Sequence, residues 1–121
     1  MKGIGNDIVK IDRIRKLIER HQERFYHKIF TPAESAYCLS HRDSAIHFGG
    51  RFSAKEAVVK ALGVGFGKEI GFLEVEIKND PKGKPFVSFS DAINEKWNWP
   101  EVLISISHTE EYATAIALYL K

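Results

Sequence analysis

The sequence predicts a single α+β domain in which helices come first and strands later. Capped helical patterns fill much of residues 1–62, whereas alternating apolar and polar residues dominate residues 72–120. Elements segregated in this way favour helices packed on a mainly antiparallel sheet over a doubly wound parallel sheet. The chain contains no repeat, linker or low-complexity tract, so we assign residues 1–121 to one domain.

The chain opens with a predicted strand followed by a predicted helix. Residues 2–11 are rich in β-branched side chains and end in polar ones, as strands commonly do. From Asp12 the apolar residues change to helical spacing and form one stripe, at Ile14, Leu17, Ile18, His21 and Phe25. We therefore expect one helix directly after the first strand.

A capping pattern predicts the next helix. Thr31 is placed to cap it, and Pro32 suits its first position. Glu34, three residues after Thr31, completes a capping box. We expect this helix to end near Ser40.

A second pattern of the same kind places another helix later. Ser53 and Glu56 repeat the capping spacing, and Gly63 is suited to end the helix. The Gly49–Gly50 pair weakens any helix before Ser53. The expected helix therefore begins at Ser53.

The second half of the chain reads as strands and one short helix. Two alternating segments flank a turn and predict a hairpin, at 72–78 and 85–90. Residues 90–97 predict a short helix, and residues 102–108 and 112–120 predict two further strands.

Composition narrows the class of protein. With 44% hydrophobic and 28% charged residues, the chain is an ordinary globular one and not a disordered one. No apolar run reaches membrane-spanning length, and Asp7 interrupts any N-terminal signal core. Cys38 is the only cysteine, which excludes an intrachain disulfide and suits a reducing compartment. We expect a cytoplasmic protein with a buried, unreactive Cys38.

Charge is distributed unevenly along the chain. Residues 1–62 hold 12 Lys/Arg and 7 Asp/Glu, a net +5, whereas residues 63–121 hold 6 and 9, a net −3. Arg13, Lys16, Arg20 and Arg24 form a basic stripe at helical spacing. The stripe fits a solvated helix face, and it also fits an acidic partner.

Three polar residues are candidates for chemistry. Asp7 lies in an apolar strand, where a carboxylate needs a backbone partner or a metal ion. Glu56 fits the capping role, and its spare oxygens leave it free to bind a metal. Lys60 lies four residues after Glu56, so it suits an ion pair on the helix or a phosphate contact.

Two further segments are open to two interpretations. Gly63, Gly65 and Gly67 would let the backbone approach a ligand, although they match neither a P-loop nor a dinucleotide fingerprint. Ser107, His108 and Thr109 follow a predicted strand, where they suit a phosphate contact or a locally bonded turn.

The order of these segments resembles a known family. "GIGNDIV", "RFSAKEAVVKALGVGFG", "GKP" and "SISHT" follow one another as in the 4′-phosphopantetheinyl transferases, and in particular the short bacterial holo-acyl-carrier-protein synthases. The resemblance extends from residue 3 to about residue 118. It implies transfer of 4′-phosphopantetheine from coenzyme A to a serine of apo-acyl carrier protein in fatty acid biosynthesis, with release of adenosine 3′,5′-bisphosphate.

The resemblance also implies roles for residues. Asp7 and Glu56 would hold Mg²⁺ on the coenzyme A diphosphate, and Lys60 would stabilise the phosphates. The general base would be Glu56 or a metal-bound water, with Glu56 preferred. The remaining implied contacts with coenzyme A are Arg51, Lys55, Gly63, Gly65, Pro85, Ser107, His108 and Thr109.

The resemblance further implies partners. Acyl carrier protein would dock on Arg13, Leu17, Arg20 and Arg24, and three copies of the chain would share active sites between neighbouring subunits. No nucleic acid and no membrane is expected as a partner.

Two other functions remain open from the residues alone. A nucleic-acid or nucleotide-binding module would use the basic first half with exposed aromatic rings, for which Phe25, Tyr26 and Phe30 are the candidates. A scaffold protein with a vestigial site would keep the fold without the activity.

Overall fold

The computed structural model describes residues 1–121 and has the α+β architecture that the sequence predicts. The elements in chain order are β1 (Gly3–Lys10), α1 (Ile11–His21), α2 (Glu23–Ile29), α3 (Pro32–Leu39), α4 (Ser44–Ala61), η1 (Phe72–Glu74), β2 (Val75–Asn79), β3 (Pro85–Phe89), α5 (Asp91–Lys96), β4 (Val102–His108) and β5 (Tyr112–Tyr119). None of the helices combines the length and the apolar character that crossing a membrane requires.

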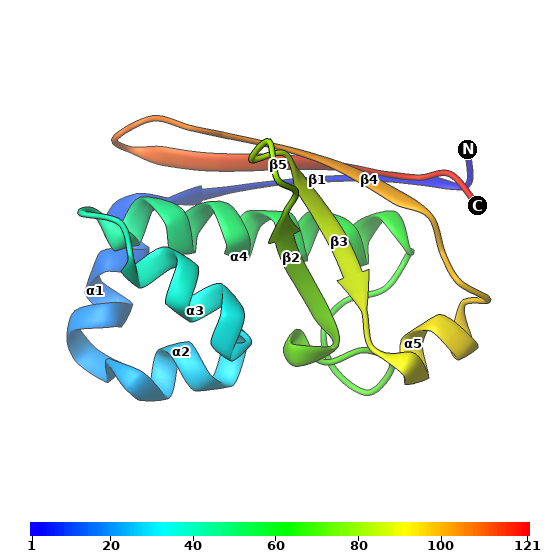
Figure 1. Ribbon diagram of the computed structural model, residues 1–121, viewed down its shortest axis with the longest axis horizontal. Coiled ribbons are helices and arrows are strands. Elements are labelled where there is room, and N and C mark those ends of the chain that lie inside the picture. Colours follow the sequence, from blue (N-terminus) through cyan, green and yellow to red (C-terminus); the bar gives the residue numbers. More distant parts are fainter.

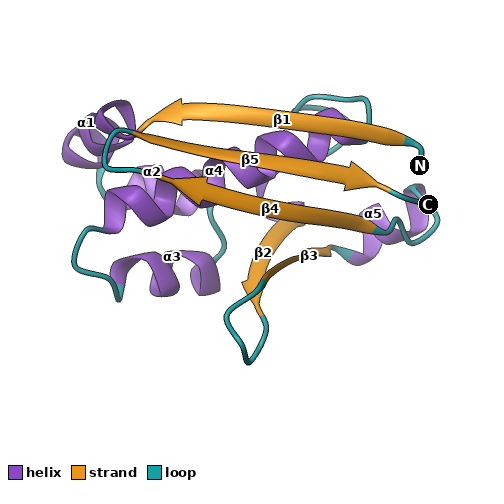
Figure 2. Cartoon of the chain, turned by 90° about the horizontal axis from the view of Figure 1, so that it is seen from above, coloured by secondary structure: helices purple, strands orange, loops and turns teal.

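One antiparallel sheet of three strands, in the order β1-β5-β4, forms a layer over the long helix α4 (Figure 1). Helices α1 to α3 lie below α4 at one end, the β2–β3 hairpin crosses near the middle of α4, and α5 lies at the other end. Seen from above, the three strands run side by side with no helix over their outer face (Figure 2).

The core forms around α4 in two clusters. One joins α4 to the sheet, the hairpin and α5 through side chains such as Val58, Val75 and Ile93. The other joins α4 to α1, α2 and α3 through Phe25, Phe30, Phe48 and Cys38, among others. Burial raises the pKa of the Cys38 thiol to about 12, so this cysteine is as unreactive as expected.

The capping prediction for α3 is confirmed. Thr31 Oγ1 accepts from the Glu34 amide at 3.2 Å, and Glu34 Oε1 accepts from the Thr31 amide at 2.9 Å. Gly63 follows the end of α4 with a φ of +83°, a left-handed conformation that glycine adopts without strain.

The predicted start of a helix at Ser53 is wrong. Helix α4 begins at Ser44 and runs through Gly49, Gly50 and Ser53 without a break. A Cβ at Gly49 would stand 2.7 Å from Ile11 Cδ1. Glycine has a low helix propensity, but at this position it allows the first residue of α1 to pack closely against α4.

Ser53 is fully buried within α4, and its hydroxyl donates to the Ala113 carbonyl at 3.2 Å instead of capping a helix. Glu56 consequently lies in the helix interior and has no capping role. The single helix expected after the first strand is also divided, because Gln22 adopts a φ of +45° between α1 and α2.

Candidate functional site

Two glycines of β1 set the distance between the sheet and α4. A Cβ at Gly3 would lie 2.0 Å from the Ala61 carbonyl oxygen, and one at Gly5 would lie 2.1 Å from the Ala57 carbonyl oxygen. Real side chains do not fit at such distances, so only glycine lets β1 lie directly on the helix. Asp7, two residues beyond Gly5 on the same face of the strand, is thereby brought against α4.

The close packing brings two carboxylates and one ammonium group together. Lys60 Nζ lies 3.1 Å from Asp7 Oδ1 and donates to the Asn6 carbonyl at 3.0 Å. Glu56 has no ion-pair partner within 4.0 Å, although it lies one turn before Lys60. Burial and, to a lesser degree, the charge of Asp7 raise the pKa of Glu56, while Lys60 lowers it. A cation between the two carboxylates would relieve both effects.

Asp7 and Glu56 line the same cavity, which has a volume of about 250 Å³ and is partly open to solvent. Its other walls come from β1, α1 and α4, as Ile8, Val9, Arg13, Ile14, Leu17 and Phe52. We call the four residues predicted to dock the carrier protein, Arg13, Leu17, Arg20 and Arg24, the docking stripe, and the carboxylates lie beside its first two members.

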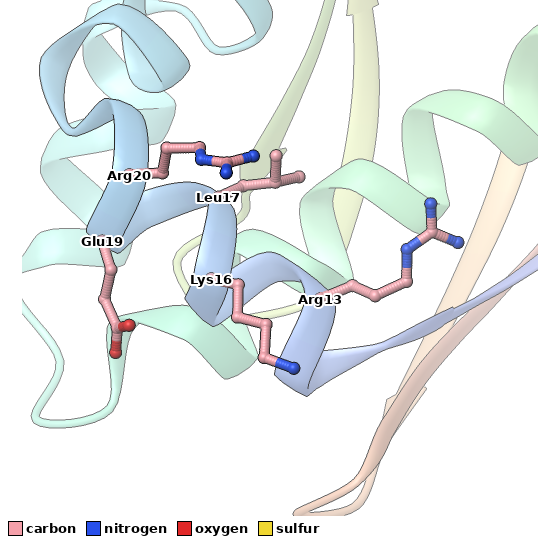
Figure 3. Close-up of a pocket in the computed structure, with 5 residues that line it drawn as sticks. All are labelled: Arg13, Lys16, Leu17, Glu19 and Arg20. Carbon is pink, nitrogen blue, oxygen red and sulfur yellow. The ribbon is translucent and has the colours of Figure 1, made fainter.

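The stripe continues along α1. Arg13, Leu17 and Arg20 project from one side of this helix, and Glu19 points away from them (Figure 3). These residues, with Lys16, line a neighbouring hollow. Arg24 is further along, on α2, where it borders a separate hollow with Lys28. The predicted stripe is thus continuous over α1 and bends at Gln22 before it reaches Arg24.

The "SHT" segment lies at the other edge of the sheet. Ser107 and His108 alternate in β4, so Ser107 faces the uncovered side and His108 faces α4. The His108 ring lies 5.8 Å from the ring of His47 in α4. Thr109 Oγ1 accepts from two amides of its own turn, at 3.1 and 3.2 Å, which is the local role left open by the sequence.

Arg51 lies on the same side of the molecule as His108 and is 5% exposed. Its guanidinium stacks on the Tyr37 ring at 4.0 Å and donates to the side-chain carbonyl of Asn79. Nε has no partner within the chain, and no carboxylate pairs with this arginine.

Asp7 and His108 do not meet within one chain. Asp7 pairs with Ala115 and His108 with Ala113, from opposite sides of the central strand β5. The carboxylates therefore lie at the β1 edge of the sheet, and the histidine lies at the β4 edge.

The comparisons with known proteins decide the family. The family profile described as the 4′-phosphopantetheinyl transferase superfamily matches residues 3–117. This chain belongs to that superfamily.

Full-length relatives make the membership more specific. The holo-[acyl-carrier-protein] synthase of Protochlamydia amoebophila is 51% identical over 117 residues, covering 97% of this chain and 96% of the relative. The synthase of the same name from Chlamydia felis is 48% identical over 120 residues, covering 99% and 98%.

Solved structures of synthases confirm the fold. The Helicobacter pylori holo-[acyl-carrier-protein] synthase, in complex with coenzyme A, superposes with a TM-score of 0.89 at 36% identity, covering 97% of this chain and 99% of that one. The Neisseria meningitidis enzyme superposes with a TM-score of 0.91 at 31% identity, covering 100% and 99%. The expected superfamily fold is thus confirmed.

The first lysine of the transferase motif does not have the expected environment. Lys55 is fully buried, and its Nζ lies 2.6 Å from Glu34 Oε1. It also donates to the carbonyls of Ile29 and Phe72, at 2.6 and 2.9 Å. An ammonium group has three hydrogens, and all three have partners inside the protein. The predicted phosphate contact of Lys55 is therefore wrong, and Lys55 ties α4 to α3 instead.

The other predicted contacts lie in two separate places, after the end of α4 and at the start of β3. Gly63 and Gly65 lie in the exposed loop after the helix, with open space where a side chain would begin. Pro85 begins β3 and borders a hollow between the hairpin and β4 with Phe86 and Leu103. Neither group lies in the cavity of Asp7 and Glu56.

The aromatic residues of the nucleic-acid hypothesis belong to the core. Phe25 and Phe30 are buried, and Tyr26 stacks on Phe48 with ring centroids 4.8 Å apart. These rings are not available to stack on bases, which removes the observation on which that hypothesis depended.

Sequence reasoning missed two groups. Glu34 was assigned only a capping role, yet it also accepts from the Ile77 amide at 2.8 Å and pairs with Lys55. No pattern in the sequence singles out His41 and His47, yet their ring centroids stack 3.7 Å apart. The Glu34–Lys55 pair and the His41–His47 pair each join different parts of the chain, so neither pair is related by helical spacing. The sequence therefore holds no direct signal for them.

Proposed function

We propose that the protein is a Mg²⁺-dependent holo-acyl-carrier-protein synthase of fatty acid biosynthesis. It transfers 4′-phosphopantetheine from coenzyme A to a serine of apo-acyl carrier protein and releases adenosine 3′,5′-bisphosphate. The observation that carries this proposal is the convergence of Asp7 and Glu56, 49 positions apart, in one cavity bordered by basic residues of α1. The full-length similarity to synthases supports it.

The two carboxylates fit a magnesium ion. Mg²⁺ prefers one or two carboxylates together with phosphate oxygens and water, and this cavity supplies two acidic side chains and an opening to solvent. Glu56 lacks a cation partner and has a raised pKa, as expected of a ligand whose metal is provided from outside the chain. When bound, the ion would neutralise charge on the diphosphate as its bond to the leaving nucleotide breaks.

The chain's own residues would perform the other steps. Lys60, whose side chain is half exposed at the cavity edge, would hold a phosphate oxygen of the donor. Glu56 would accept the proton of the attacking serine, because it lies in the same cavity as the proposed metal ion and beside the residues that would bind the carrier protein. Arg13 and Leu17 would bring that serine to the cavity by binding the carrier protein beside it.

We further propose a homotrimer with shared sites, which the uncovered face and edges of the sheet support. Large apolar residues on the outer face are exposed, including Ile4, Ile8, Leu103 and Ile116 at 41–65%. A patch of this kind marks an interaction surface. Placing the β4 edge of one copy beside the β1 edge of the next would bring the "SHT" segment and Arg51 of one subunit to the carboxylates of another.

A direct transfer assay tests the proposal. Apo-acyl carrier protein is incubated with the protein, coenzyme A and Mg²⁺, and its intact mass is measured. We expect a gain of one phosphopantetheine, which is abolished by a chelator and by Asp7→Asn or Glu56→Gln. An unmodified carrier protein in the presence of folded wild-type protein would refute the activity.

A further inference from the structure

Three histidines from three elements gather beside Arg51. The rings of His41, after α3, and His47, in α4, stack with centroids 3.7 Å apart and an interplanar angle of 26°. The His108 ring, at the end of β4, meets His47 edge to face at 5.8 Å. Tyr37 completes the group, with its ring 4.6 Å from His41 and under the Arg51 guanidinium. We call these four side chains with Arg51 the histidine cluster.

Arg51 gives the cluster a buried charge that no acid balances. It is 5% exposed, its hydrogen-bond acceptor is a neutral amide, and its Nε is unpartnered. Buried charges in proteins are normally paired, and an unpaired one is costly. Arg51 therefore indicates an anionic partner from outside the chain.

The nearby acids are engaged elsewhere. Asp43 forms a two-pronged ion pair with Arg15, at 2.9 and 3.2 Å, and this pair holds the pKa of Asp43 below its usual range. Glu110 and Glu111, in the β4–β5 turn, border a hollow with Lys10, Asp12 and Arg15. The groups that face His47 are thus His41, His108 and Arg51, with the neutralised Asp43 as the one acid.

The hydrogen bonds of His41 define where a proton would bind. Its Nδ1 lies 2.8 Å from the Tyr37 carbonyl oxygen, so Nδ1 carries the hydrogen and Nε2 is the acceptor in the neutral ring. A neutral His41 presents a lone pair at Nε2, which repels an anion. The ring becomes a second donor only after it gains a proton.

The stacked geometry opposes protonation of His47 as long as no anion lies beside the rings. Two imidazolium rings at 3.7 Å would repel each other, and Arg51 adds to the repulsion. Burial and these positive neighbours lower the pKa of His47. An anion placed against the cluster would instead favour protonation of the imidazole rings, because the positive charge of each added proton would then have a negative partner.

We propose that the histidine cluster is a proton-linked phosphate subsite, in which His41 or His47 takes up a proton as a phosphoryl group of the ligand binds beside Arg51 and His108. The inference rests on the proposed function for the ligand, coenzyme A, which carries both a phosphate monoester and a diphosphate. His41 and His47 thereby become specificity-determining residues, since a neutral ligand would gain nothing from the added proton.

Proton uptake during binding tests the proposal. Coenzyme A is titrated into the protein at pH 7 by isothermal calorimetry, in two buffers that differ in ionisation enthalpy. We expect net proton uptake by the wild type, loss of most of it in His41→Gln and His47→Gln, and no change in His27→Gln, which replaces an exposed histidine of α2. No uptake by the wild type, or equal uptake by all variants, would overturn the proposal.

One further ligand, dephospho-coenzyme A, identifies the phosphoryl group. Dephospho-coenzyme A lacks the monoester, so uptake that disappears with it assigns the monoester to the cluster, and uptake that persists assigns the diphosphate. Failure of the proposed function has a different result, because a protein without that function would neither bind coenzyme A nor modify the carrier protein at any pH. Normal transfer at saturating coenzyme A without proton uptake would contradict the subsite alone.

Discussion

Gly5 lies so close to Ala57 that a Cβ in its place would stand 2.1 Å from the Ala57 carbonyl oxygen. The same atom would stand 2.7 Å from the amide nitrogen of Ala61, so the obstacle is helix backbone that cannot rotate away. This contact fixes β1 on α4 and, through it, the distance between Asp7 and Glu56.

Gly5→Ala should therefore impair both folding and activity. We expect a loss of about 1–3 kcal/mol in the free energy of unfolding, as is typical of overpacking, measured by urea denaturation. Gly71→Ala is the matched control, because its Cβ would meet only Glu74 Oε1 at 3.6 Å and its φ is not positive. That variant should change stability by less than about 0.5 kcal/mol. Wild-type stability in Gly5→Ala would contradict the packing argument.

Many of the helices and strands of the fold can be predicted from the sequence, because strand alternation, turns and the Thr31 capping box are local signals. The Ser53 pattern misled for an equally physical reason. It has the residues of a capping box, but packing of Gly49 against Ile11 carries the helix through it. Local propensity predicts an element only where tertiary contacts do not outweigh it.

The candidate site could likewise be predicted only in part from the sequence. Asp7, Glu56 and Lys60 were found from residue type and motif spacing, and the structure brings them together. Lys55 is the neighbour of Glu56 in the motif, yet a helix turns successive side chains about 100° apart, and this one points into the core. Which lysine faces solvent depends on what packs on each side of α4, and spacing alone does not encode it.

Glu56→Gln should separate metal binding from stability. In the wild type, the raised pKa means that folding favours the protonated carboxyl, so stability is lost as the pH rises from the unfolded value through the folded one. Without divalent cations above that range, the variant should melt at the same temperature as the wild type or higher, and the difference should shrink toward pH 4.

Added Mg²⁺ should raise the melting temperature of the wild type but not that of the variant. The kcat/KM of the variant should be about 100-fold lower than that of the wild type, or lower still, as for loss of one preorganised electrostatic group. Thermal melts with and without a chelator, together with the transfer assay, check both. A variant that Mg²⁺ stabilises as strongly as the wild type would exclude Glu56 as a ligand.

The two lysines of the motif should behave in opposite ways. Lys55→Met leaves Glu34 buried without its cation, and we expect a loss of about 3–5 kcal/mol in the free energy of unfolding. Lys60→Met removes a half-exposed side chain, so it should change stability by about 1 kcal/mol or less while lowering kcat.

Urea denaturation of both variants and of Glu34→Gln/Lys55→Met completes the comparison. The double variant should recover part of the stability lost in Lys55→Met, because no unpaired carboxylate remains. If Lys55→Met were as stable as the wild type but inactive, the buried ion pair would not be the role of Lys55.

Arg13→Glu should weaken recognition of the carrier protein. Arg13 lines both the carboxylate cavity and the hollow along α1, so a reversed charge there opposes an acidic partner at the site of transfer. We expect KM for the carrier protein to rise about tenfold, about 1.4 kcal/mol, with KM for coenzyme A unchanged. Steady-state kinetics at two salt concentrations check this, and the difference from wild type should shrink at high salt.

Lys121→Glu makes the same charge change at the exposed C-terminus and serves as the control. Equal effects of the two variants would show that net charge, and not the α1 surface, governs recognition.

Ile116→Glu should dissociate the proposed trimer. Ile116 is 41% exposed at the centre of the uncovered sheet face, where its outward neighbours across the strands are Asn6 and Ser105. A carboxylate buried there between subunits would lack a cation, which is unfavourable enough to oppose association.

Leu39→Glu, at a 50% exposed position on α3, introduces the same charge away from the sheet. Light scattering coupled to size exclusion should give a monomer for Ile116→Glu and a trimer for Leu39→Glu and the wild type. Because the carboxylates and the "SHT" segment lie at opposite edges of one sheet, the monomer should remain folded yet lose transfer activity, and a fully active monomer would show that one chain holds a complete site.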